Sequence, residues 1–267
     1  MTAAARSTGS AAIQGELWSA RARDWAGTQE ATFRVVYDAV LTRLALRAGT
    51  TVFDAGCGAG LFARLAAARS AMVTGLDASP ALIEIARERT PHGDFRVGDL
   101  ESLPYVDRAF DVVTGFNSFQ FAANPGNALQ EARRVTRPGG RVVIVTWGNP
   151  GDCEAAAYLD ALASLLPPLP PGAPGPVALS APGALEQLVG EAGLVPEDAV
   201  MVDCLWSYPD LDTALKGLLS AGPAIGAIRQ AGESAARDAV SEAIRPFRTT
   251  RGGYELENRV RYLVAHT

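Results

Sequence analysis

Apolar residues along this chain follow two alternating patterns. Short runs rich in valine, isoleucine and phenylalanine predict strands, and apolar residues at helical spacing between them predict helices of about ten residues. The predicted strands are 51–55, 72–77, 94–97, 110–115, 141–147, 200–206 and 259–265. The predicted helices among the first five strands are about 61–69, 79–89 and 126–135. Strands separated by such helices are typical of an α/β fold whose parallel sheet carries helices on both faces.

Before the first strand the pattern is helical. Residues 14–48 have an apolar face at helical spacing, and Gly49 is the predicted helix stop. Trp18 and Trp25 are either core anchors or part of a lid. The first dozen residues are small and polar, which predicts disorder.

After the fifth strand the alternation breaks down. Helices are expected near 153–166 and 183–192, and a mostly helical stretch at 210–247, with an extended proline-rich linker at 167–176. The interruptions at about 150–180 and 210–248 are too hydrophobic for linkers. We expect them to form a cap over the carboxyl ends of the strands, where such sheets bind ligands. The predicted organisation is a tail with cap helices over 1–48 and one α/β domain over 49–267.

Composition excludes several classes of protein. The 267 residues are 48% hydrophobic and 20% charged, which predicts a globular core, and the net charge of −5 argues against nucleic-acid binding. Cys57, Cys153 and Cys204 lack metal-ligand spacing, so we expect free thiols, a reducing compartment and no metal site. The first residues suggest neither a signal peptide nor a membrane span, so we expect a cytoplasmic protein.

A glycine-rich turn follows the first strand. Asp54 ends that strand, and Gly56, Gly58 and Gly60 come at alternate positions before the next helix. Glycine admits positive φ and lets a ligand approach the main chain, although a simple tight turn has the same pattern. The G-K-[ST] ending of a phosphate loop is absent, and Leu61 stands where the third Rossmann glycine would fall.

Three more strands end in residues suited to binding a ligand. Asp77 ends the second strand, 23 residues after Asp54, where a carboxylate can accept hydrogen bonds from ribose hydroxyls. Ser79 is a better helix N-cap than Asp77. Asp99 follows the third strand, and the fourth ends near Asn117. Four successive strand ends with such residues are harder to obtain by chance than one turn.

Together these stretches resemble the class I S-adenosylmethionine-dependent methyltransferases, most closely the type 11, or ubiquinone/menaquinone-biosynthesis-like, small-molecule branch. The matching segments are VFDAGCGAG at 52–60, GLDAS at 75–79, GDLESLP at 98–104, FDVVTGFNSFQF at 110–121 and ARRVTRPGGRVVIVTW at 132–147. The resemblance implies a Rossmann-like, seven-stranded, mostly parallel sheet with an antiparallel last strand. It also implies S-adenosyl-L-methionine as cofactor and S-adenosyl-L-homocysteine as product.

The resemblance assigns roles along the methionine part of the cofactor. Asp54 would order the turn and help hold the amino group. The other contacts would come from Ala55, Gly56, Gly58, the Phe116 carbonyl and Asn117.

It assigns the adenosine part to the next two strand ends. Asp77 would bind both ribose hydroxyls, and Ala78 would pack on the adenine. Asp99 and Leu100 would hold the polar edge and the face of the adenine.

For the methyl acceptor the sequence offers aromatic residues, three of them at or just past strand ends and Trp25 in the N-terminal helical segment. Trp25, Phe119, Phe121 and Trp147 are candidate walls of an acceptor pocket or ordinary core residues. Such a pocket favours an apolar or aromatic small molecule over a charged polymer. Neither histidine is an obvious base, and we name no catalytic residue.

The sequence leaves three candidate functions. The leading one is methyl transfer to an O, N or C atom of a small organic acceptor by proximity and desolvation. The alternative is a protein that binds the cofactor without transferring methyl, as a cyclase, rearrangement catalyst or regulator. A nicotinamide-dependent oxidoreductase is disfavoured by the missing third glycine. The sequence leaves open the acceptor, the atom methylated and whether two copies form a homodimer.

Overall fold

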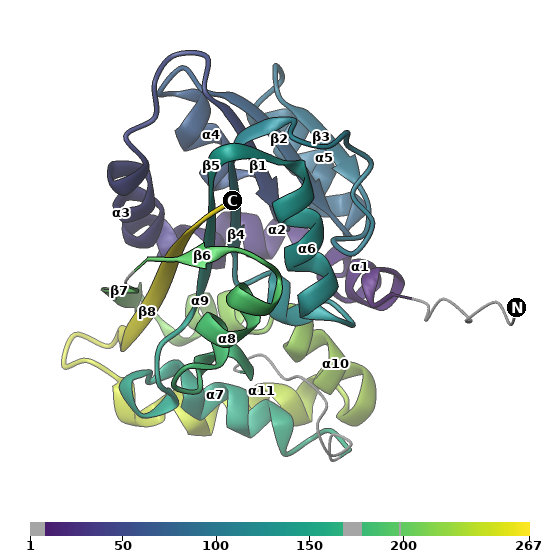
Figure 1. Ribbon diagram of the computed structural model, residues 1–267. Coiled ribbons are helices and arrows are strands. Elements are labelled where there is room, and N and C mark those ends of the chain that lie inside the picture. The colour runs from purple at the N-terminus through teal and green to yellow at the C-terminus, as the bar shows by residue number, and fades with distance from the viewer. Residues whose placement is uncertain (1–8, 168–177, 198) are drawn as a thin grey trace, which may run out of the picture.

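An eight-stranded sheet runs through the middle of the protein in the computed structural model, which describes residues 9–167, 178–197 and 199–267 (Figure 1). Its order is β3-β2-β1-β4-β5-β8, and both β6 and β7 pair with β8. The strands are β1 (Thr51–Ala55), β2 (Met72–Asp77), β3 (Asp94–Val97), β4 (Phe110–Phe116), β5 (Thr136–Trp147), β6 (Val195–Pro196), β7 (Val200–Tyr208) and β8 (Tyr254–His266).

The first five strands are parallel, and β8 runs antiparallel to β5. The predicted α/β class, mostly parallel sheet and antiparallel last strand are therefore confirmed. The predicted number of seven strands is wrong by one, because β6 has two residues and is too short to give a pattern. β5 and β8 also begin five residues earlier than predicted, and β8 extends beyond β5 to pair with β7.

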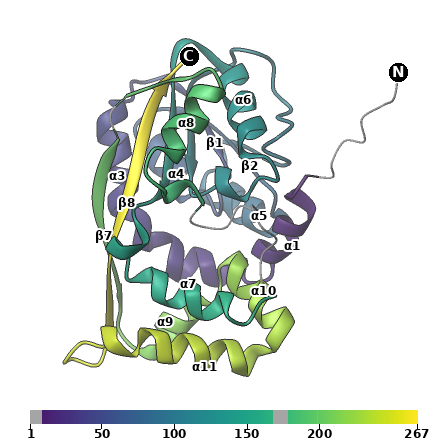
Figure 2. The ribbon, with the colours of Figure 1, turned by 60° about the horizontal axis from the view of Figure 1, so that its bottom comes forward.

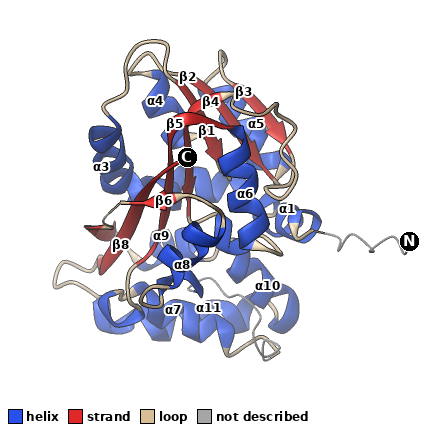
Figure 3. Ribbon diagram, viewed as in Figure 1, coloured by secondary structure: helices blue, strands red, loops and turns tan. Residues whose placement is uncertain are grey.

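Helices cover both faces of the sheet (Figure 3). Alternate residues of a strand point to opposite faces, so neighbours such as Val143 and Ile144 of β5 lie in different apolar clusters. One cluster contains the buried faces of α3 (Arg34–Leu44) and α4 (Leu61–Ala67), and the other those of α6 (Pro125–Val135) and α8 (Ala184–Glu191).

The N-terminal segment is a series of short helical pieces. These are α1 (Ala11–Ser19), α2 (Ala22–Asp24), a π-helical turn (Trp25–Gln29), a 3₁₀ turn (Glu30–Phe33) and α3. Disorder was expected through residue 12, but Ala11 and Ala12 belong to α1. The predicted stop at Gly49 is also wrong, because the helix ends at Leu44, where Ala45 takes the left-handed conformation and its N–H bonds the Leu41 carbonyl.

Four later helices pack together at one end of the sheet (Figure 2). They are α7 (Ala155–Ala163), α9 (Leu211–Leu218), α10 (Gly222–Ala231) and α11 (Glu233–Ile244), while α5 (Pro80–Arg89) packs beside β2 and β3. The linker expected at 167–176 falls almost entirely outside the described residues. All three cysteines are buried free thiols. Within the described ranges, no helix combines the length and apolarity needed to cross a membrane.

Candidate functional site

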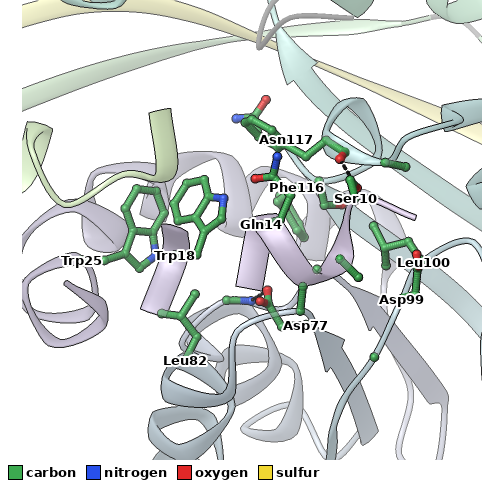
Figure 4. Close-up of a pocket in the computed structure, with 18 residues that line it drawn as sticks. Ser10, Gln14, Trp18, Trp25, Asp77, Leu82, Asp99, Leu100, Phe116 and Asn117 are labelled. Atoms are coloured by element: carbon green, nitrogen blue, oxygen red, sulfur yellow. Dashed lines mark hydrogen bonds between the residues drawn. The ribbon is translucent and has the colours of Figure 1, made fainter. Parts of the chain in front are cut away.

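A cavity lies where β1, β2 and β4 end (Figure 4). These strands are neighbours and parallel, so their carboxyl ends meet at one edge of the sheet. The predicted cofactor residues that line this cavity are Gly56, Gly58, Asp77, Ala78, Asp99, Leu100, Phe116 and Asn117. Asp54 and Ala55 are not among the lining residues.

The glycine turn needs glycine for two different reasons. Gly56 has a φ of 75°, and a Cβ there would lie 2.4 Å from the Cβ of Ser118, so the β4 loop packs directly on its backbone. Gly58 has a φ of 54°, but a Cβ there would meet only Glu30 and Trp25 at 3.6 and 3.8 Å. A Cβ at Gly58 would make only ordinary van der Waals contacts, so it is the positive φ that favours glycine there, and its main chain lines the cavity.

Asp77 is fixed at the tip of β2 by main-chain hydrogen bonds. Its Oδ2 accepts from the Gly58 N–H at 2.9 Å and its Oδ1 from the Ser79 N–H at 2.8 Å. Each carboxylate oxygen has a second lone pair, so Asp77 can still accept two hydroxyl donors. Burial raises the pKa of Asp77. The predicted N-cap role of Ser79 is confirmed, because its Oγ accepts from the Leu82 N–H at 3.1 Å.

Asp99 and Leu100 line the other end of the cavity. Asp99 Oδ1 accepts from the Glu101 N–H at 2.9 Å, which orients the carboxylate. Leu100 places an apolar side chain next to it (Figure 4). The pair offers a hydrogen-bond acceptor and an apolar surface within one site.

Asp54 and Ala55 lie beneath the turn. Asp54 is 2% exposed and accepts from the Thr114 hydroxyl at 2.8 Å, and the Ala55 carbonyl accepts from the Ser118 hydroxyl at 2.6 Å. Burial raises the pKa of Asp54 to about 7. These contacts join β1 to β4 under the cavity, so a direct contact of Asp54 with a ligand is not supported by its position.

Helix α1 lies over the cavity. Cap helices were expected in this segment from the sequence, but apart from the tryptophans the residues through which they contact the site were not. Gln14 and Trp18 line it from this helix (Figure 4). The hydroxyl of Ser10, which also lines it, donates to the Phe121 carbonyl at 2.6 Å. A Cβ on Gly15 would lie 2.4 Å from the Ala78 carbonyl oxygen, so the helix backbone rests on the β2–α5 loop. A glycine within a short helix was the only sequence signal of this close approach.

A second cavity adjoins the first and shares wall residues with it. The shared residues are Trp18, Trp25, Phe116, Asn117 and Phe121. The other lining residues are Gln29, Phe33, Tyr37, Trp147, Tyr158, Leu159, Trp206, Ala221 and Pro223. All four tryptophans of the chain line it.

Of the predicted acceptor-pocket residues, Trp25, Phe121 and Trp147 line this second cavity, and Phe119 does not. Phe119 is 1% exposed and packs in the core against Gly115, whose Cβ would lie 2.3 Å from its ring. Phe119 and Phe121 are two apart in a 3₁₀ turn, so their side chains point in different directions. Of the two alternatives left open for Phe119, pocket wall or core residue, its position fits the core.

A buried ion pair joins the N-terminal segment to the glycine turn. Glu30 is 2% exposed, pairs with Arg89 and accepts from the Leu61 N–H at 3.2 Å. Arg89 also donates to the carbonyls of Ala26 and Ala59 at 2.7 and 3.0 Å. Burial raises the pKa of Glu30. The pair thus fixes the π-helical turn, which carries Trp25 and Gln29, against the turn after β1.

Comparison with known proteins identifies the core of this arrangement. Residues 53–144 match the family model described as a methyltransferase domain, which confirms the resemblance seen in the sequence. The chain is 38% identical over 98 residues to malonyl-[acyl-carrier protein] O-methyltransferase of Serratia marcescens, covering 37% of this chain and 38% of the relative.

It is also 35% identical over 181 residues to 27-O-demethylrifamycin SV methyltransferase of Amycolatopsis mediterranei (strain S699), covering 64% of this chain and 63% of the relative. The chain therefore spans less than two thirds of the length of either relative. Among solved structures, the YcgJ protein of Bacillus subtilis has a similar fold, with a TM-score of 0.61, 19% identity, and coverage of 86% of this chain and 97% of that one. At that identity the likeness supports the fold alone.

Proposed function

We propose that this protein binds S-adenosyl-L-methionine and transfers its methyl group to a small organic acceptor, because residues 53–144 match the family model described as a methyltransferase domain. The observation that carries the proposal is the pair of adjoining cavities. One is built from strand ends with acids and bare main chain, and the other from aromatic side chains. Donor and acceptor can thus lie side by side, with Phe116 and Asn117 between them.

The residues of the first cavity fit the cofactor in chemistry. Asp77 offers acceptors suited to the ribose hydroxyls, Asp99 and Leu100 suit the adenine, and Gly58 gives the methionine part access to the main chain. When bound, the cofactor supplies a methyl group already activated by its sulfonium.

What the chain itself contributes is positioning and exclusion of water. Holding two reactants in a reactive geometry can lower a barrier by about 7–11 kcal/mol. Among the described residues that line the second cavity, none is a histidine, an acid or a lysine. Tyr37 and Tyr158 supply its hydroxyls, and burial raises the pKa of both. A phenol with a raised pKa stays protonated at neutral pH, so neither tyrosine is expected to act as a general base.

The test is calorimetry with S-adenosyl-L-methionine on the wild type and on Asp77→Ala. Loss of charge-assisted hydrogen bonds worth about 1.5–3 kcal/mol should weaken binding roughly 10- to 150-fold. Asp38→Ala removes an exposed acid on α3, away from the cavity, and should bind like the wild type. Equal affinity of Asp77→Ala and wild type would refute the ribose assignment.

Transfer is tested separately from binding. The protein is incubated with methyl-labelled cofactor and a metabolite extract, and the products are analysed for label. Labelled product supports transfer and excludes a protein that only binds the cofactor. Tight cofactor binding without any labelled product would favour that alternative.

A further inference from the structure

The second cavity has walls of rings and no charged side chain among the described residues that line it. Trp147 and Trp206 form an edge-to-face pair with centroids 5.5 Å apart, and Phe33 lies 5.8 Å from each. Tyr37 is edge-on to Phe116 at 4.8 Å. Burying an unpaired charge against such walls is costly, whereas a flat ring can pack on them with favourable aromatic geometry.

Gln29 is a buried polar side chain in this aromatic wall. It is 2% exposed, and its Oε1 accepts from the Tyr208 hydroxyl at 2.7 Å, which fixes the orientation of the amide. Its Nε2 has one protein partner, the Thr32 Oγ at a long 3.4 Å. An amide nitrogen has two hydrogens, so one N–H has no acceptor in the part of the chain that the structure describes.

The local backbone holds Gln29 in this place. It is the last residue of the π-helical turn, a rare element that is frequent at functional sites. Arg89 holds the Ala26 carbonyl of the same turn at 2.7 Å. Gly217 of α9 leaves room for the amide, because a Cβ there would lie 2.7 Å from the Gln29 Oε1. The donor is therefore fixed before any ligand binds.

We infer that the second cavity binds a flat, uncharged ring compound with a carbonyl oxygen that accepts a hydrogen bond from the Gln29 amide. The inference rests on the proposed function, in which this compound is the methyl acceptor. A buried donor left unpaired costs more than a satisfied one gains, so Gln29 selects ligands that supply an oxygen there. Gln29 is thus a specificity-determining residue, and Tyr208 positions it.

The test uses a matched pair of probes, 9-fluorenone and fluorene, which share a flat three-ring frame and differ by the carbonyl. Because all four tryptophans line the cavity, quenching of intrinsic fluorescence reports binding directly. Wild type should bind 9-fluorenone saturably and should bind 9-fluorenone-4-carboxylate at least about tenfold more weakly. Absence of saturable quenching, or tighter binding of the carboxylate, would overturn the inference.

The role of Gln29 is read from the ratio of the fluorene and 9-fluorenone dissociation constants. Gln29→Leu should lower that ratio by about 3- to 10-fold, the worth of one hydrogen bond. Gln187→Leu, the same change on the exposed face of α8, should leave it unchanged. A ratio equal in wild type and Gln29→Leu contradicts the inference, and Gln29→Met provides a second variant if leucine prevents folding.

These outcomes are independent of methyl transfer. Gln29-dependent binding of 9-fluorenone in a protein that binds no S-adenosyl-L-methionine would refute the proposed function and leave the ring site standing. Tight cofactor binding without binding of 9-fluorenone would refute the ring site and leave the proposed function standing.

Discussion

Asp54 shows how a single buried acid can shape the site without touching a ligand. Its carboxylate is 2% exposed and has one side-chain hydrogen bond, from the Thr114 hydroxyl. Burial, opposed by the hydrogen bond from Thr114 and helped by the nearby carboxylates of Glu30 and Asp77, raises its pKa from the usual 3.8 to about 7. A cationic ligand in the adjoining cavity would favour the ionised form. In the protein without ligand, ionising the buried carboxyl group of Asp54 costs free energy.

That cost predicts a pH-dependent effect of Asp54→Asn. The folded-state pKa lies above the unfolded one, so the stability from this group is fully present below about pH 3.8 and is lost as pH rises to about 7. Asparagine keeps the acceptor for Thr114 and has no charge. The variant should therefore gain stability relative to wild type between pH 4 and 7, by up to about 4 kcal/mol at about 1.4 kcal/mol per unit, with no further gain above. Urea unfolding across pH 4–8 measures it.

Asp111→Asn provides a control whose stability relative to wild type should change with pH in the opposite direction. Burial alone would raise the pKa of Asp111, but hydrogen bonds from Thr51 and the ion pair with Arg137 lower it. That variant should lose stability relative to wild type as pH rises from below pH 3.8. A flat difference between wild type and Asp54→Asn over the whole range would show that Asp54 ionises normally.

At the scale of elements, α1 is the part of the site that depends on close packing. It lies over the first cavity through the Ser10–Phe121 hydrogen bond, through a contact between the hydroxyls of Ser19 and Ser79 at 2.8 Å, and through Gly15. Trp18 packs edge-on to Trp25 with centroids 4.8 Å apart. The helix is therefore held by tertiary contacts more than by its own propensity.

Gly15→Ala tests this docking. A methyl group at Gly15 would meet the Ala78 carbonyl oxygen at 2.4 Å, so α1 must shift away from the β2–α5 loop. Overpacking of this kind costs about 1–3 kcal/mol. We expect lower stability by that amount and weaker binding of S-adenosyl-L-methionine, measured by thermal unfolding and calorimetry.

Gly27→Ala is the matched control, because Gly27 is also in a helical turn and a Cβ there would have no neighbour within 4 Å. It should match or slightly exceed wild type in stability. Equal behaviour of the two variants would mean that α1 does not rest on Ala78 in solution.

The elements differ in how far the sequence could predict them. Strand ends such as Asp77 and Asp99 were predictable, because a parallel sheet brings consecutive strand ends to one edge. Cap helices before the first strand were also expected, but the contacts that hold α1 were not predictable, because they are with Ala78 and Phe121, far along the chain. Gln29 was missed for the same reason, because its partner Tyr208 is distant in sequence.

At the scale of the whole molecule, the sheet separates two apolar cores and leaves the site at one edge of both. The walls of the two cavities include residues of α1, the π-helical turn, α3, α7 and α10, of β5 and β7, and of the loops that follow β1, β2 and β4. No single stretch of the chain contains the site. A ligand in the first cavity should therefore stabilise segments that are far apart in sequence.

Hydrogen exchange with and without S-adenosyl-L-methionine checks this coupling. Amides of α1 and of residues 56–58, 77–82 and 116–122 should be protected together, because α1 must open before a ligand beneath it can leave. At a free concentration about 100 times the dissociation constant, binding adds about 2.7 kcal/mol to that opening, which slows exchange roughly 100-fold. Amides of α8, which contribute nothing to either cavity, should be slowed only to the extent that global unfolding governs their exchange. Protection confined to the strand ends, with α1 exchanging as fast as before, would show that the helix does not close over the cofactor.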